Sequence, residues 1–175
     1  MELYNNYANP NNRSETFNFE KLPENADQLM TMPEARLNSP FMTAALTVLA
    51  CCRYEYNQQE CIDMLNFLQG PKKLAPIDIQ FLRDRLSGKG YVPRSYLAGT
   101  NPQNNYTPTQ PYTVTVEENP YSYTNEGYAT LYIRSSGADS PRQVTLRQKG
   151  NGQWFLWQNM LLPDIRIPIN NDPWA

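Results

Sequence analysis

A change in hydrophobic period partway along the chain constrains the fold more than any other feature of this sequence. Up to about residue 90, apolar residues recur every three or four positions, as in Cys61–Leu68. From Tyr112 onward they alternate with polar residues, as in Tyr112–Glu117. The first spacing is typical of helices and the second of strands. Helices followed by strands predict an α+β fold.

The helical half, residues 21–90, is expected to hold three or four helices. Ser39–Pro40 is a typical helix start, because serine caps free backbone N–H groups and proline needs no donor at the first helical position. Asn57 has the position of an N-cap for the next helix, which Gly70 ends. Pro76 begins a further helix with an apolar stripe on one side.

The sheet half, residues 112–175, is predicted to be a four-stranded antiparallel meander with the helices packed on one face. The expected strands are 112–117, 128–134, 143–149 and 153–158. Aromatic residues fall on both faces of the last strand, which predicts that this strand is covered on both sides. One continuous core is expected from Val48, Leu65, Leu82, Leu131, Ile133, Val144, Leu146 and Trp154.

Two segments lack a hydrophobic period. Residues 1–20 are rich in Asn, Tyr and Ser, and we expect a mobile or loosely docked N-terminal segment. Residues 91–111 form a long Tyr/Asn/Pro loop without secondary structure, which we expect to be ordered over the sheet. The remaining chain, 21–175, is expected to be a single domain.

The composition argues against most enzyme chemistry. The chain has no histidine, which removes the usual general base and the commonest transition-metal ligand. Its three cysteines cannot form an all-cysteine zinc site, and we interpret them as buried structural residues. We therefore predict no catalytic residue, no cofactor and no metal, and the balance leans against an enzyme.

Charge and hydropathy limit the partners and the location. The chain has 15 Lys+Arg against 17 Asp+Glu, which is unlike a nucleic-acid binder driven by bulk charge. No apolar run approaches the roughly 20 residues of a membrane span, and the N-terminus is unlike a signal peptide. With an odd cysteine count, these features favour a cytoplasmic protein with neither a nucleic-acid nor a membrane partner.

Two clusters could carry recognition. Arg134–Arg142 is the densest run of polar residues, and its serines, Gly137 and arginines could cradle an anion. It could equally be a strand-to-strand loop in which Arg134 pairs with Asp139. Eight of the twelve tyrosines lie between Tyr91 and Tyr132, either as a contact surface or as pins for the long loop. The candidate contact residues are Tyr96, Tyr106, Tyr112, Arg134, Asp139 and Arg142.

Two functional hypotheses remain open. The first is a non-catalytic interaction or structural module that docks onto another protein or onto itself. The second is a small-ligand-binding or substrate-processing domain, with an anionic or sugar ligand between the helices and the sheet. A deep pocket with converging polar groups favours the second, and an exposed aromatic patch favours the first.

The stretch NNYTPTQPYTVTVEENPYSYTNEGYATLYIRSSGADSPRQVTLRQKGNGQWFLW, together with LQGPKKLAPIDIQFLRDRL before it, resembles a family of bacterial proteins described as a domain of unknown function. The resemblance covers residues from about 20 to the end. It implies a bacterial cytosolic source and implies no activity, cofactor or catalytic residue.

Overall fold

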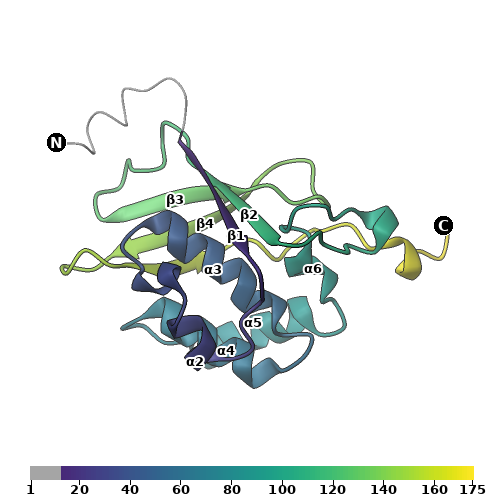
Figure 1. Ribbon diagram of the computed structural model, residues 1–175, viewed down its shortest axis with the longest axis horizontal. Helices are drawn as coiled ribbons and strands as arrows, with labels where there is room; N and C mark the ends of the chain where they lie inside the picture. The colour runs from purple at the N-terminus through teal and green to yellow at the C-terminus, as the bar shows by residue number, and fades with distance from the viewer. Residues whose placement is uncertain (1–12) are drawn as a thin grey trace.

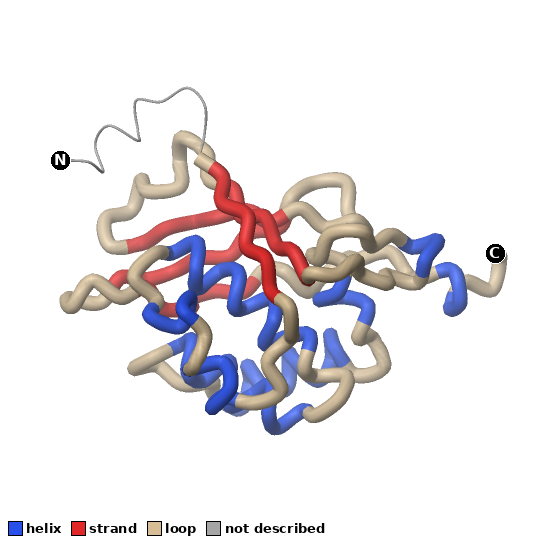
Figure 2. The backbone as a smooth tube through the Cα atoms, viewed as in Figure 1, coloured by secondary structure: helices blue, strands red, loops and turns tan. Residues whose placement is uncertain are grey.

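A five-stranded antiparallel sheet forms one layer of the protein, and helices cover one of its faces (Figures 1 and 2). The computed structural model describes residues 13–175. The strands are β1 (Ser14–Phe19), β2 (Tyr112–Glu117), β3 (Tyr128–Ile133), β4 (Arg142–Gln148) and β5 (Trp154–Asn159), in that order across the sheet. The helices are α2 (Ala26–Met30), α3 (Pro40–Cys52), α4 (Gln58–Gln69), α5 (Pro76–Leu86) and α6 (Tyr91–Arg94), with 3-10 turns at Pro33–Arg36, Pro102–Asn104 and Ile169–Asn171.

The α+β class and the antiparallel sheet are confirmed, but the sheet has five strands rather than four. The additional strand is β1, which lies inside the segment expected to be mobile or loosely docked. It pairs with β2 over its whole length, from Ser14 opposite Glu117 to Phe19 opposite Tyr112. The first twelve residues of that segment lie outside the described part of the chain.

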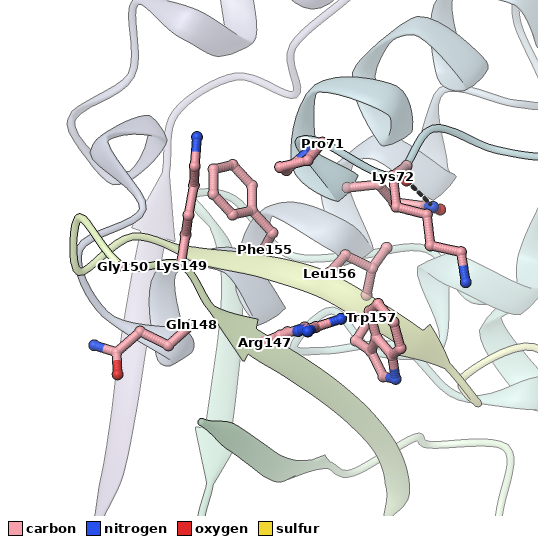
Figure 3. Close-up of a pocket in the computed structure, with 10 residues that line it drawn as sticks. Pro71, Lys72, Arg147, Gln148, Lys149, Gly150, Phe155, Leu156 and Trp157 are labelled. Carbon is pink, nitrogen blue, oxygen red and sulfur yellow. Dashed lines mark hydrogen bonds between the residues drawn. The ribbon is translucent and has the colours of Figure 1, made fainter. Parts of the chain in front are cut away.

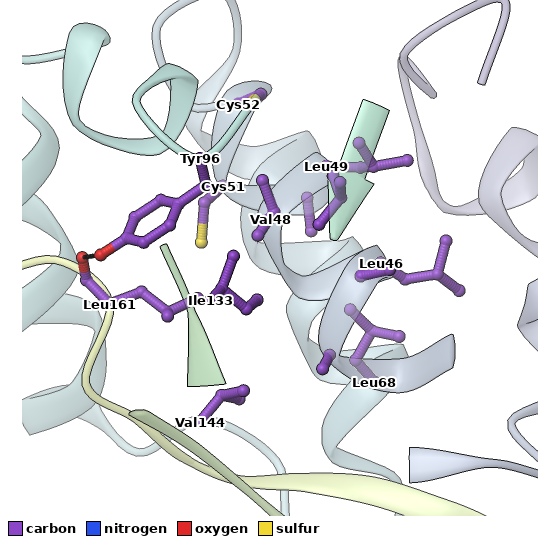
Figure 4. Close-up of a cluster of buried hydrophobic side chains, with 14 of the residues drawn as sticks. Leu46, Val48, Leu49, Cys51, Cys52, Leu68, Tyr96, Ile133, Val144 and Leu161 are labelled. Carbon is purple, nitrogen blue, oxygen red and sulfur yellow. Dashed lines mark hydrogen bonds between the residues drawn. The ribbon is translucent and has the colours of Figure 1, made fainter. Parts of the chain in front are cut away.

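Helix α3 forms the centre of the core, between the sheet and the other helices (Figure 4). Its start follows the sequence prediction, because the Ser39 side chain accepts a hydrogen bond from the Phe41 N–H at 3.2 Å and Pro40 occupies the first turn. All of its residues except Met42 are buried. Its two threonines are satisfied internally: the Thr43 hydroxyl donates to the Trp154 carbonyl at 2.6 Å, and the Thr47 hydroxyl to the Thr43 carbonyl at 2.8 Å.

The predicted core is confirmed as one continuous cluster. It contains Val48, Leu65, Leu82, Leu131, Ile133, Val144, Leu146 and Trp154. The β-strand members of this set all point to the helical side, so alternate residues such as Thr130 and Tyr132 lie on the opposite, outer face. No helix from α2 to α5 covers that outer face (Figure 2).

The prediction that segment 91–111 lacks secondary structure is wrong. It contains the short helix α6 and a 3-10 turn at Pro102–Asn104. Asn101 and Asn104 cap the turn reciprocally, each side-chain oxygen accepting the other residue's backbone N–H, at 2.8 and 3.0 Å. These elements are too short to produce a hydrophobic period, which explains why the pattern missed them.

Candidate functional site

The two tyrosines predicted at the centre of the long loop are structural. Tyr106 is fully buried, stacks on Tyr91 with ring centroids 5.6 Å apart, and donates its hydroxyl hydrogen to the Arg166 carbonyl at 2.6 Å. Tyr96 is buried as well, and its hydroxyl donates to the Leu161 carbonyl. Burial raises the pKa of both phenols above the ordinary value of 10.0. Both rings therefore tie the loop to the C-terminal segment.

Tyr112, the third predicted tyrosine, is half-buried at the start of β2. It lines a hollow of about 460 Å³ in which acidic and basic side chains are mixed, among them Glu20, Lys21 and Arg53. Arg53 is held by Glu60, with Nε and Oε2 2.7 Å apart. This hollow has no excess of one charge.

The segment Arg134–Arg142 does not converge on a ligand. The expected pair of Arg134 with Asp139 is wrong: Arg134 pairs with Glu117, Nε to Oε1 at 3.1 Å, and Asp139 pairs with Arg166. Arg142 donates to the Ser140 side chain and carbonyl and to the Asp164 carbonyl. The three charged residues therefore face three different partners.

The serines of the same segment bind the α6 region. The Ser135 hydroxyl donates to the Ser95 hydroxyl at 2.6 Å and accepts the Gly137 N–H at 3.1 Å. The Ser136 and Thr100 hydroxyls lie 2.9 Å apart. Each buried side-chain nitrogen or oxygen within residues 13–175 has a hydrogen-bond partner. The polar run is thus a junction between the β3–β4 connection and α6.

A different cluster has the composition of a binding site, and we call it the basic–aromatic pocket (Figure 3). It is a cavity of about 390 Å³ where the hairpin between β4 and β5 meets the end of α4. Its lining residues are Gln69, Pro71, Lys72, Arg147, Gln148, Lys149, Gly150, Phe155, Leu156 and Trp157.

A glycine brings the two walls of this pocket together. Gly70 ends α4 with a φ of 62°, a conformation that favours glycine. A Cβ at this position would lie 2.4 Å from Cδ1 of Phe155. The close approach places the following residues, Pro71 and Lys72, beside Phe155 and Trp157 of β5.

Two of the three cations of the pocket, Lys72 and Arg147, lie around one indole. Cζ of Arg147 and Nζ of Lys72 each lie 4.6 Å from the ring centroid of Trp157, and Figure 3 shows them reaching the ring from different sides. Tyr128 extends the cluster: its ring meets Trp157 edge-on, with centroids 5.8 Å apart, and lies 5.5 Å from Cζ of Arg147. Such cation–π contacts each contribute about 0.5–1 kcal/mol at exposed sites.

These cations form no ion pair within the described part of the chain. No residue lining the pocket is acidic, and among residues 13–175 no carboxylate forms an ion pair with Lys72, Arg147 or Lys149. The pocket is therefore a local positive patch on a chain whose net charge is −2. An anion placed there is attracted electrostatically and meets an apolar wall of Phe155 and Leu156.

The side chains of the pocket are cations, amides and apolar groups. No carboxylate, thiol or hydroxyl side chain lines it. The cysteines lie in the core instead, where burial raises the pKa of Cys51 to about 12 and that of Cys52 and Cys61 further. In the described part of the chain, no group of three or more His, Cys, Asp or Glu residues is placed to hold a metal.

The sequence analysis missed this pocket because its residues come from three separate stretches. Aromatic residues on both faces of the last strand predict that it is covered on both sides, yet Trp157 is 38% exposed. The available signal was the pairing of Arg147 with Phe155 across the β4–β5 hairpin, which follows from the register of the two strands. Lys72 could not be placed there from its own neighbours in sequence.

Comparison with known proteins gives a family but no function. No helix among the described residues is both long enough and apolar enough to cross a membrane. Neither a curated protein nor a solved structure matches the chain. A family model described as a domain of unknown function, DUF6935, matches residues 21–169. Because this match spans most of the sequence, the chain belongs to the DUF6935 family.

Proposed function

We propose that this protein is a non-catalytic binding module that recognises a negatively charged partner through the basic–aromatic pocket. One observation carries the proposal: Lys72, Arg147 and Lys149 line a single cavity without a carboxylate among its lining residues, and two of them contact Trp157. Like charges held near one another repel, and a bound anion relieves that repulsion.

The aromatic rings make the cluster suitable for recognition. The guanidinium of Arg147 contacts the rings of both Trp157 and Tyr128, so less side-chain freedom is lost when Arg147 binds an anion. The pocket also lies on a strand hairpin and a helix end rather than on a long loop, which keeps its geometry fixed.

The interaction-module hypothesis is thus retained, but the proposed contact surface is the basic–aromatic pocket rather than segment 91–111. Tyr96 and Tyr106 are buried, so the segment 91–111 does not present them to a partner. The alternative hypothesis placed an anionic or sugar ligand between the helices and the sheet. That space is occupied by α3, whose side chains are almost all buried. We further propose a cytoplasmic, bacterial protein, which three free and buried cysteines support.

A charged polymer tests the proposal without knowledge of the natural partner. Fluorescently labelled poly-L-glutamate is titrated with the wild-type protein and with Arg147→Gln, and binding is followed by anisotropy. Arg134→Gln is the matched control, because Arg134 is an exposed arginine whose guanidinium is paired with Glu117. We expect Arg147→Gln to weaken binding by about tenfold and Arg134→Gln to leave it within about twofold.

Salt and a neutral polymer complete the test. Binding to the wild type should fall as ionic strength rises, because exposed charges are screened. Poly-L-glutamine of the same length should not bind. Absence of binding at low salt, or equal losses in the two arginine variants, contradicts the proposal.

A further inference from the structure

The two edges of the sheet, formed by β1 and β5, differ in how their outward backbone groups are paired. On the β5 edge, the Trp154 N–H donates to the Leu37 carbonyl at 2.7 Å, and the Trp154 carbonyl accepts the Thr43 hydroxyl hydrogen at 2.6 Å. The pairing of β5 with β4 also shifts register between Thr145 and Leu146, and such irregularities hinder the addition of another strand. Helix α4 packs against β5 as well. The β5 edge is therefore closed by the chain itself.

On the β1 edge, every second residue directs its backbone groups away from the sheet. The Glu118 N–H donates to the Arg13 carbonyl, so Arg13 and every second residue after it bond to β2. Asn18 lies opposite Thr113, whose carbonyl accepts the Ala98 N–H from the side away from β1. The backbone groups of Asn18 therefore point outward, as this alternation requires.

The outward residues of β1 are Ser14, Thr16 and Asn18. All three are exposed, and their backbone groups have no hydrogen-bond partner among residues 13–175. Edge strands commonly carry proline, lysine or a bulge, which hinder pairing with another chain. Strand β1 has the sequence SETFNF and an unbroken register with β2, so it has none of these features. The open edge is complementary to another extended strand.

The attachment of β1 to the rest of the sheet gives a reason for such pairing. Strand β2 pairs with β1 along all of β1, but with β3 only at Val116 and Glu117. Strands β1 and β2 thus form a two-stranded ribbon at one side of the sheet (Figure 1). Isolated two-stranded ribbons are marginally stable, and further strands stabilise them. A strand added to β1 would stabilise this ribbon.

We propose that β1 pairs antiparallel with β1 of a second copy of the chain, about a two-fold axis at Thr16. In this register Thr16 faces its counterpart, and Ser14 of each copy faces Asn18 of the other. Each outward N–H and C=O group of these residues then finds a partner. The two sheets become continuous, and the two-stranded ribbon becomes four-stranded. The proposal goes beyond the proposed function, because it concerns the edge opposite to β5.

The side chains of the outer face suit a second copy. Ser14, Thr16 and Asn18 are short and polar, and they alternate with the inward Phe17. The Thr16 and Thr115 hydroxyl oxygens already lie 2.9 Å apart across the β1–β2 pair. A threonine pair across the two-fold axis continues this hydroxyl ladder, and such pairs stabilise antiparallel strands.

The charged side chain of β1 selects the register. Glu15 already has an arginine partner beside it, and with Thr16 on the axis it faces Phe17 of the second copy. In the register that sets Ser14 opposite Thr16, the two Glu15 side chains would face each other, which is unfavourable. In the register that sets Thr16 opposite Asn18, Ser14 has no partner within the strand. The Thr16-centred register is the one that avoids both losses.

Sedimentation equilibrium of the full chain measures the self-association. We expect a reversible dimer with a dissociation constant on the order of 100 µM, because one strand pair buries less surface than a stable dimer interface. A protein that remains monomeric up to about 1 mM contradicts the inference.

Charge variants at the axis test the register. Thr16→Lys and Thr16→Glu each place like charges opposite one another, so each variant alone should self-associate about tenfold more weakly than the wild type. An equimolar mixture of the two should regain association, because opposite charges then meet. Gln143→Lys and Gln143→Glu are matched controls at an exposed outer-face position of β4, and they should associate as the wild type does. A mixture that does not regain association overturns the inference.

Amide hydrogen exchange at two protein concentrations locates the interface. The outward amides of Thr16 and Asn18 should exchange rapidly in dilute protein and several-fold more slowly in concentrated protein. The Phe17 amide bonds to β2, should exchange slowly at both concentrations, and serves as the internal reference. Slow exchange of Thr16 and Asn18 in dilute, monomeric protein would show that another part of the chain covers the edge, and would overturn the inference.

A different self-association surface is the remaining outcome to separate. Ile167, Ile169 and Trp174 are exposed apolar residues near the C-terminal end. We expect Trp174→Ala to dimerise as the wild type does. If Trp174→Ala abolishes the dimer while both Thr16 variants retain it, the inference is wrong. Failure of poly-L-glutamate to bind would contradict the proposed function alone, because the basic–aromatic pocket borders β5.

Discussion

The Arg134–Arg142 segment and the basic–aromatic pocket both contain basic side chains beside strands of the same sheet. They differ in whether those side chains have polar partners within the chain. In the first, Arg134, Arg142 and Asp139 are each engaged by another part of the chain. In the second, the Lys72 and Arg147 side chains contact aromatic faces, and no carboxylate of residues 13–175 forms an ion pair with them. A dense run of polar residues therefore forms a structural junction here, and cations scattered in the sequence form the proposed binding site.

The difference has a physical basis. Buried hydroxyls such as Ser135 must be hydrogen-bonded, since an unsatisfied buried polar group costs about 1–3 kcal/mol. Polar residues that are close in sequence readily satisfy this need with one another and with a neighbouring helix. Exposed cations carry no such cost, so an uncompensated group of them can be kept for an external partner.

Tyr106→Ala should have the largest effect and should break the junction rather than the pocket. Tyr106 is fully buried, stacks on Tyr91 and is hydrogen-bonded to the Arg166 carbonyl. Loss of this ring should lower the free energy of unfolding by about 3–5 kcal/mol, measured by chemical denaturation. Tyr121→Ala is the control, because Tyr121 is 73% exposed and should change stability by less than about 0.5 kcal/mol. A loss of similar size in the two variants would show that the junction is not stabilised by this ring.

Ser135→Ala should have a smaller effect on the same junction. The substitution removes the donor to Ser95 and the acceptor of the Gly137 N–H while leaving both groups buried. We expect a loss of about 1–3 kcal/mol in denaturation experiments, with poly-L-glutamate binding unchanged. Ser140→Ala, at an exposed position of the same segment, provides the reference. Weakened binding in Ser135→Ala would mean that the junction contributes to recognition.

Arg147→Gln should show the reverse behaviour: a clear loss of binding with little change in stability. Its guanidinium is exposed, and its contacts among residues 13–175 are cation–π contacts with Tyr128 and Trp157, so the free energy of unfolding should change by no more than about 1 kcal/mol. Denaturation and anisotropy measured on the same preparation check the two expectations together. A stability loss comparable to that of Tyr106→Ala would show that Arg147 stabilises the fold rather than serving binding.

Alkaline pH should destabilise the buried core through its thiols. Burial raises the pKa of Cys51 from 9.0 to about 12, so the native state retains a proton that the unfolded state releases above pH 9. This contribution is fully present below pH 9 and is lost as the pH rises towards 12. Unfolding free energies across this range should decline less steeply for Cys51→Ala. A steeper decline in that variant would contradict a raised pKa of the Cys51 thiol in the native state.

The sequence pattern predicted the elements whose signals are local. Ser39–Pro40 located the start of α3, and alternation located the inner faces of β2, β3 and β4. It missed β1, because Ser14–Phe19 is a short stretch whose partner lies about 100 residues away. The position of Lys72 over Trp157 was equally inaccessible, since it depends on how α4 ends against β5. Both β1 and the basic–aromatic pocket depend on contacts between residues that are distant in sequence.

The measurement that tests the central claim most directly is a titration of isotope-labelled protein with poly-L-glutamate, followed by amide chemical shifts. The account predicts that the shifted signals cluster at residues 69–72, 147–150 and 155–157, which line the basic–aromatic pocket. Signals from 134–142 should remain in place, because the charges of that segment are already engaged. Shifts concentrated in 134–142, with the pocket unaffected, would contradict the account.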